Sequence, residues 1–265
     1  MPRTRLQFAA LSVLVLLLLA LPGASPSHGA EGEDPYRFEI EFEGGAAWQS
    51  RNNVEIPNDG TATRFSLKDL VGTGPLPVGR FYFGWNINRR HGLRVLLAPL
   101  SYTETGTFDS PVIFVGETYA AGTPTEATYQ FNSWRLTYRY QFWQGKKWDW
   151  WVGFTAKVRD AKIELAQGAT TSKDTDVGFV PLLYLRGDYH FSKNWHFLFE
   201  MDALGGGPGR AEDVSLRMGR DLGEQWSINF GYRTVEGGVD IDDVYNFAWF
   251  NYAVVSGVYR WGGKH

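Results

Sequence analysis

The stretch "RFEIEFEGG" (37–45) alternates apolar and acidic side chains from one position to the next. A period of two indicates a β-strand with one apolar face and one polar face. Residues on the same face of a strand lie about 6.5–7 Å apart, so three carboxylates in a row need neutralising partners. The acidic face consists of Glu39, Glu41 and Glu43. The stretch therefore predicts a strand whose two faces meet different environments.

The first 30 residues have the organisation of a cleaved secretory signal peptide. Arg3 and Arg5 precede an apolar run from Ala9 to Leu21, and small residues follow this run. The run is shorter than a membrane-spanning helix requires. We therefore predict a signal peptide at residues 1–30 and one exported domain at residues 31–265.

Composition excludes several classes of protein. The chain contains no Cys, so disulfides, thiolate metal sites and a lipid anchor on Cys are all excluded. Its formal net charge is −3 and the charges are spread along the chain, which argues against a nucleic-acid partner.

The alternation of the opening stretch recurs along the whole exported domain and predicts ten strands. In the fifth strand the apolar phase slips by one position near Arg159–Ala161, which predicts a β-bulge there. The predicted strands lie near residues 38–48, 79–87, 92–104, 133–142, 148–165, 177–189, 195–203, 214–218, 226–232 and 245–261.

The predicted connections alternate between short and long. An up-and-down outer-membrane barrel has short periplasmic turns and longer outer loops, and an even number of strands leaves both termini at the periplasmic side. We predict short turns at 88–92, 143–148, 191–195 and 220–225, and long loops near 50–75, 104–126, 166–176, 204–212 and 236–243.

A soluble barrel with an inward apolar face is the alternative to a membrane barrel. Ten faces rich in Phe, Trp and Tyr are too bulky for a small barrel interior, which favours the membrane barrel. Two aromatic girdles around an aliphatic band are also typical of the two bilayer interfaces. The tryptophans predicted to form these girdles are Trp48, Trp85, Trp134, Trp148, Trp195, Trp226, Trp249 and Trp261.

The signal segment, the alternating strands and the terminal "VVSGVYRW" (254–261) resemble those of Gram-negative outer-membrane β-barrel proteins. The resemblance implies an all-β, transmembrane, antiparallel up-and-down barrel in the bacterial outer membrane. It also implies contact with outer-membrane lipid and lipopolysaccharide, and insertion by the barrel-assembly machinery. We expect a monomer. The resemblance is architectural and indicates no functional subfamily.

If the apolar faces meet lipid, the charged side chains line the lumen. Arginine suits this position because its guanidinium pairs with a carboxylate through two hydrogen bonds. We favour a salt-bridge network that stiffens the barrel over a charged constriction that selects solutes. The residues predicted to form this lumenal network are Glu39, Glu41, Glu43, Arg80, Arg135, Arg139, Lys157, Arg159, Arg186, Glu200, Asp202, Arg217, Arg233 and Arg260. Arg94 is also predicted to reach inward.

No catalytic, cofactor-binding or metal-binding residue is predicted. Outer-membrane proteases, phospholipases and lipid A deacylases typically pair a His with Ser or Asp at the outer leaflet or rim. Here His91, His190 and His196 fall near the predicted periplasmic turns, and His265 lies in the tail. We interpret His196, with Glu200 and Asp202, as part of a lumenal polar cluster.

Three classes of function remain open at the level of sequence. A non-enzymatic structural or surface-interaction barrel is favoured. A narrow channel or transporter for small polar solutes is the alternative, since open aqueous pores usually need 16 or more strands. A lipid-modifying enzyme is the least favoured.

Overall fold

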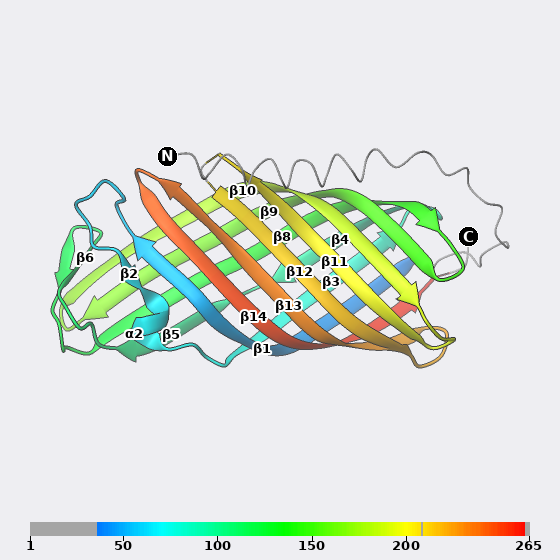
Figure 1. Ribbon diagram of the computed structural model, residues 1–265, viewed down its shortest axis with the longest axis horizontal. Coiled ribbons are helices and arrows are strands. Elements are labelled where there is room, and N and C mark those ends of the chain that lie inside the picture. The colour runs from blue at the N-terminus through cyan, green and yellow to red at the C-terminus, as the bar shows by residue number, and fades with distance from the viewer. Residues whose placement is uncertain (1–35, 208, 263–265) are drawn as a thin grey trace.

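The computed structural model describes residues 36–207 and 209–262. The predicted signal peptide and His265 therefore lie outside the described residues. Within the described ranges, ten antiparallel strands form a closed barrel in chain order, and β14 pairs with β1 to complete the circle (Figure 1). The predicted all-β barrel and its strand number are confirmed.

The wall of the barrel consists of β1 (Phe38–Glu55), β3 (Leu76–Asn86), β4 (His91–Ala98), β8 (Thr125–Gln144), β9 (Trp148–Gln167), β10 (Thr170–His190), β11 (Trp195–Gly206), β12 (Gly209–Asp221), β13 (Trp226–Ile241) and β14 (Val244–Trp261). β5 (Ser101–Gly106) continues the line of β4 along β8. Four small elements lie in the connections: β2 (Phe65–Ser66), α2 (Leu67–Val71), β6 (Val112–Phe114) and β7 (Glu117–Tyr119).

The two faces of β1 meet different environments, as the alternation predicts. Phe42 is 63% exposed on the outer surface, whereas Glu43 is 1% exposed inside the barrel. Phe38 is paired with Trp85 of β3 on one side and with Trp261 of β14 on the other. Both ends of the barrel chain therefore lie side by side at the end that carries the short turns.

Three of the five predicted long loops are wrong. Residues 166–176, 204–212 and 236–243 belong largely to strands that continue to tight connections between β9 and β10, β11 and β12, and β13 and β14. Lys173 of β10, for example, still pairs with Glu164 of β9. Both faces of these strand ends are partly exposed or polar, so they lack the apolar alternation that reveals the rest of the strand.

The predicted β-bulge near Arg159–Ala161 is also wrong. The pairing of β9 with β10 runs without a shift from Arg159 and Gly178 to Ala161 and Asp176. The apolar phase changes because Ile163 and Leu165 point into the barrel, where they join a buried apolar cluster. The interior changes from polar to apolar at this height, while the strand keeps its register.

The apolar cluster arises from the two long connections, residues 56–75 and 107–124, which fold over the barrel mouth and which we call the loop cap. Val115 N donates to Ile56 O at 2.9 Å and joins the two connections. Gly106 is required beneath the cap, since a Cβ there would lie 1.7 Å from Leu70 O. Figure 1 shows α2, β2 and β6 gathered at the left end of the barrel. The cluster includes Phe65, Leu67, Leu70, Phe108, Phe114 and Tyr119 of the cap, and Tyr129, Phe250 and Tyr252 of the wall.

The single helix among these cap elements is short. α2 has 5 residues, and the Ser66 hydroxyl caps it by accepting from Asp69 N at 3.2 Å. Among the described residues, no helix has the length and apolar character needed to cross a membrane.

Candidate functional site

Ten charged side chains meet in the middle of the barrel, and we call them the central ion network. They come from the inward faces of seven strands, and each of these residues is at most 8% exposed. Among the described residues the set holds equal numbers of guanidinium and carboxylate groups: Arg80, Arg94, Arg135, Arg217 and Arg233 with Glu41, Glu43, Glu200, Asp202 and Asp213.

Arg217 of β12 connects three carboxylates in one half of the network. Its guanidinium lies 3.1 Å from Glu43 Oε2 and 3.0 Å from Glu200 Oε2, and it also contacts Glu41. Arg94 pairs with Glu41 Oε2 at 2.8 Å and with Glu200. The Arg217 side chain is 0% exposed. A fully buried guanidinium is tolerated only where carboxylates compensate its lost hydration.

Asp213 is the corresponding centre of the other half. It lies 2.7 Å from Arg80, 2.7 Å from Arg135 and 2.5 Å from Arg233. Arg233 also pairs with Glu43 at 3.0 Å, which joins the two halves. The network is therefore a continuous, electrically balanced plug across the lumen rather than a row of isolated pairs.

Several predicted network residues lie outside this plug. Glu39 and Arg260 pair at 3.0 Å close to the short-turn end, and Arg186 lies 3.6 Å from Asp188. Arg139 donates to Asn86 Oδ1 at 3.0 Å, and Arg159 pairs with Asp176. Lys157 is buried without an ion pair among the described residues, and its Nζ lies 4.8 Å from the ring centroid of Phe131.

Sequence reasoning did not assign Asp213 to the network. The predicted strand near residues 214–218 begins one residue after Asp213, and Arg217 in this strand is predicted to face the lumen. Extending that alternation by one residue would have turned Asp213 inward, as the structure shows.

Two cavities lie on either side of the plug. One, of about 340 Å³, opens at the short-turn end and is lined by Glu39, Arg139 and Arg186 among others. We call it the vestibule. The other, of about 520 Å³, lies near the loop cap beside Lys157, Pro181 and Arg210. β10 pairs with β11 only from Leu183 onward. The second cavity therefore lies beside residues 170–182, whose pairing within the sheet is with β9.

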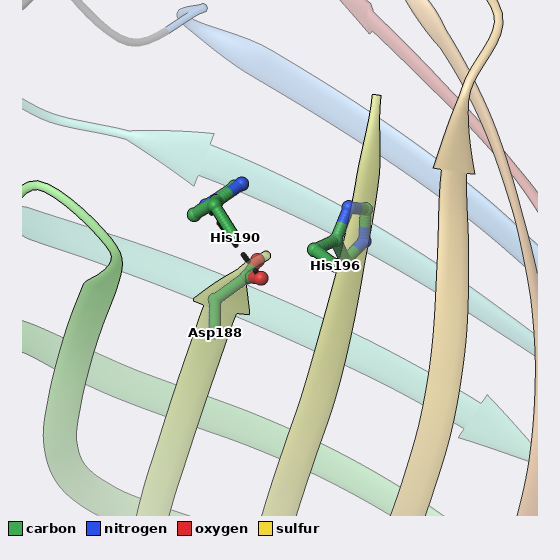
Figure 2. Close-up of side chains that lie close together, drawn as sticks. All are labelled: Asp188, His190 and His196. Carbon is green, nitrogen blue, oxygen red and sulfur yellow. Dashed lines mark ion pairs between the residues drawn. The ribbon is translucent and has the colours of Figure 1, made fainter. Parts of the chain in front are cut away.

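The described histidines all lie at the short-turn end. His190 and His196 are register partners on β10 and β11, and Asp188 lies beside them (Figure 2). His196, Glu200 and Asp202 are all buried polar residues on the inner face of β11, but the two carboxylates pair with arginines of the central ion network, whereas His196 lies beside Asp188 and His190. The difference arises because inward residues at different heights on one strand reach different partners across the lumen.

The predicted girdle tryptophans lie on the outer surface, exposed or half-buried. Trp148, Trp195 and Trp226 begin β9, β11 and β13, while Trp261 ends β14, so these four lie at the short-turn end with Trp85 of β3. Trp148 stacks on Tyr189 and Trp226 packs against Tyr259, each with 4.6 Å between ring centroids. Trp48, Trp134 and Trp249 lie farther from the short-turn end than these five tryptophans do.

Comparison with known proteins supports the architecture. No family model matches the chain, and no curated protein is significantly similar to it in sequence. The outer-membrane protease OmpT of Escherichia coli is similar in structure, with a TM-score of 0.53, 9% identity, and coverage of 89% of this chain and 100% of that one.

Two further solved structures are more distant. Ail of Yersinia pestis has a TM-score of 0.37 and 10% identity, covering 83% of this chain and 99% of that one. The toluene transporter TodX of Pseudomonas putida has a TM-score of 0.36 and 9% identity, covering 86% of this chain and 91% of that one. The likeness to OmpT shows the fold alone. With the outward apolar face, the architecture is that of a transmembrane β-barrel.

Proposed function

We propose that the protein is a non-conducting outer-membrane barrel that serves as a structural or surface-interaction protein. The central ion network is the observation that carries this proposal. Residues lining an open pore are exposed to water, yet Arg217, Glu43 and Arg233 are between 0% and 3% exposed. A charge-balanced plug of this kind stiffens the barrel and leaves no hydrated path through its middle.

The loop cap is the surface that such a barrel would present to partners. Its two connections are hydrogen-bonded to each other, and Tyr119 ties the cap to the wall by donating to Leu165 O at 3.0 Å. Binding residues are often carried on loops that a rigid scaffold positions. We expect the outer wall to contact outer-membrane lipid and lipopolysaccharide, the barrel-assembly machinery to insert the chain, and the barrel to be a monomer.

A narrow channel or transporter for small polar solutes is the second candidate. The vestibule and the cavity beside Pro181 favour it, because together they approach the plug from both ends. Transport would require ion pairs such as Glu41 with Arg94 to separate during each passage. Breaking buried pairs costs several kcal/mol, which supports the closed barrel as the first choice.

Enzymatic activity is not part of the proposal. The described histidines lie at the short-turn end, so a Ser–His or Asp–His pair at the opposite rim would lack its base. We expect the purified barrel to hydrolyse neither phospholipid nor lipid A acyl chains.

Solute flux into vesicles tests the proposal. Liposomes containing the refolded barrel should swell in isosmotic arabinose or glycine no faster than empty liposomes. Swelling that increases with the amount of folded barrel would support the transporter and overturn the closed barrel.

A further inference from the structure

The hairpin between β10 and β11 brings two imidazoles and a carboxylate together in the vestibule. His190 and His196 are paired in register, so the turn at residues 191–194 fixes their spacing. One ligand atom from each of Asp188, His190 and His196 lies within 4.8 Å of the others. Figure 2 shows the Asp188 carboxylate beside the two rings, which come from neighbouring strands.

Two buried atoms of this cluster have no hydrogen-bond partner among the described protein atoms. They are Nδ1 of His196, whose side chain is 4% exposed, and Oδ1 of Asp188. Arg186 approaches Asp188 through the other carboxylate oxygen, Oδ2, at 3.6 Å. Buried polar atoms in folded proteins nearly always have a hydrogen-bond partner, so two unpaired atoms in one cluster point to a ligand.

The fold holds His196 in a defined orientation. Gly219 on β12 leaves room for its ring, since a Cβ there would lie 2.1 Å from His196 Nε2 and 2.4 Å from Asn229 Oδ1. Nε2 therefore faces β12 and β13, which leaves Nδ1 available. An imidazole that packing holds in place, and whose Nδ1 has no hydrogen-bond partner among the described atoms, is available as a metal ligand.

We propose that Asp188, His190 and His196 bind a divalent transition-metal ion, with Zn²⁺ as the preferred ion. Nε2 of His190 lies 3.6 Å from Asp188 Oδ1 and 3.5 Å from Asp149 Oδ2. Ligand atoms around a tetrahedral Zn²⁺ are about 3.3–3.6 Å apart, given bonds of about 2.0–2.2 Å. Two imidazoles suit Zn²⁺, whereas Ca²⁺ and Mg²⁺ take oxygen ligands.

The surroundings suit a dication and allow it to enter. Asp149 near His190, and Asp221 at 3.8 Å from His196 Nδ1, add negative charge to that of Asp188. These carboxylates offset the nearby Arg186. The His190 side chain is 42% exposed to the vestibule, so the ion can arrive from the short-turn end. The site lies apart from the central ion network and does not depend on whether the lumen conducts.

Isothermal titration of the chelator-treated, refolded full-length barrel with ZnCl₂ tests the site. We expect one ion per barrel, and CoCl₂ should give the visible absorption of a tetrahedral complex at the same stoichiometry. CaCl₂ in excess should not displace either ion. The absence of stoichiometric Zn²⁺ binding by the folded barrel would overturn the proposal.

Two variants and a matched control locate the ion. His190→Gln and Asp188→Asn should each weaken Zn²⁺ binding more than about tenfold, because even indirect partners of a metal contribute that much. His91→Gln is the control, since His91 lines the same vestibule but contacts the Tyr138 hydroxyl instead. Unchanged binding in both cluster variants, or equal loss in the control, would place the ion elsewhere and overturn the proposal.

Discussion

Glu39, Glu41 and Glu43 avoid mutual repulsion because each has its own guanidinium partners. Arg260 pairs with Glu39, Arg94 with Glu41, and Arg233 with Glu43. The planar fork of arginine suits this task, since one guanidinium can join carboxylates from two strands. The acidic face of β1 is therefore stable only inside a closed barrel that brings these partners to it.

Glu41→Gln is expected to destabilise the barrel. Glu41 accepts from Arg94 at 2.8 Å and from the Ser256 hydroxyl at 2.7 Å, and it also contacts Arg217. Removing its charge leaves two buried arginines short of a carboxylate, at a cost of about 3 kcal/mol. Equilibrium urea unfolding in lipid vesicles measures the loss.

Glu104→Gln is the matched control, because Glu104 is exposed on β5 and should tolerate the same change. Equal unfolding midpoints for the wild type and the Glu41 variant would contradict the role assigned to the central ion network.

The sequence predicts which residues of the network face the lumen, but not which of them pair with one another. The period of two assigns Arg135, Glu200 and Arg217 to the inner face, and each is buried there. Their partners were not predictable, because long side chains cross the lumen between strands that are not neighbours. Arg217 of β12, for instance, reaches Glu41 of β1. Such contacts depend on strand tilt and stagger, which alternation does not encode.

The apolar outer face of each strand explains why the wall is stable in lipid. Phe154 of β9 is 67% exposed and lies six residues from the short-turn end, about 20 Å along the strand. With the usual tilt, this height is close to the middle of an apolar band about 25 Å tall.

Phe154→Arg should therefore impair insertion, because an arginine at this depth costs about 2–4 kcal/mol. Folding yield in phospholipid vesicles, followed by the gel shift of the folded barrel, measures the effect. Phe154→Leu keeps the face apolar and should fold like the wild type. Equal yields for the arginine and leucine variants would show that this face of β9 does not meet lipid.

The ends of the elements were less predictable than their centres. Alternation identifies a strand only where its two faces differ, and this condition fails beyond the apolar band. Glu236 of β13 pairs with Arg210 of β12 at 2.5 Å in a segment that resembles a polar loop in sequence. The packing of the apolar residues of the loop cap, such as Phe114, was not predicted from the sequence. These residues lie in connections, and their packing partners are distant in the sequence.

At the scale of the whole molecule, the barrel has two unlike ends. We expect the loop cap to face the outside of the cell and the short turns to face the periplasm. The chain contains no Cys, so single cysteines can report this orientation without a background. In intact cells, Asp59→Cys should react with a membrane-impermeant maleimide, whereas Lys146→Cys and Lys193→Cys should react only after lysis. The reverse pattern would invert the orientation.

The proposed function rests on the claim that the lumen is closed, and single-channel recording in planar bilayers measures whether it conducts. Folded wild-type barrel should insert without conductance steps, because the charge-balanced plug leaves no hydrated path between the vestibule and the loop cap. Glu41→Gln should lower stability and remain electrically silent. Discrete, reproducible conductance steps from the wild-type barrel would contradict the claim, and a shift towards anion preference in Glu41→Gln would place the plug residues in the lining of a working pore.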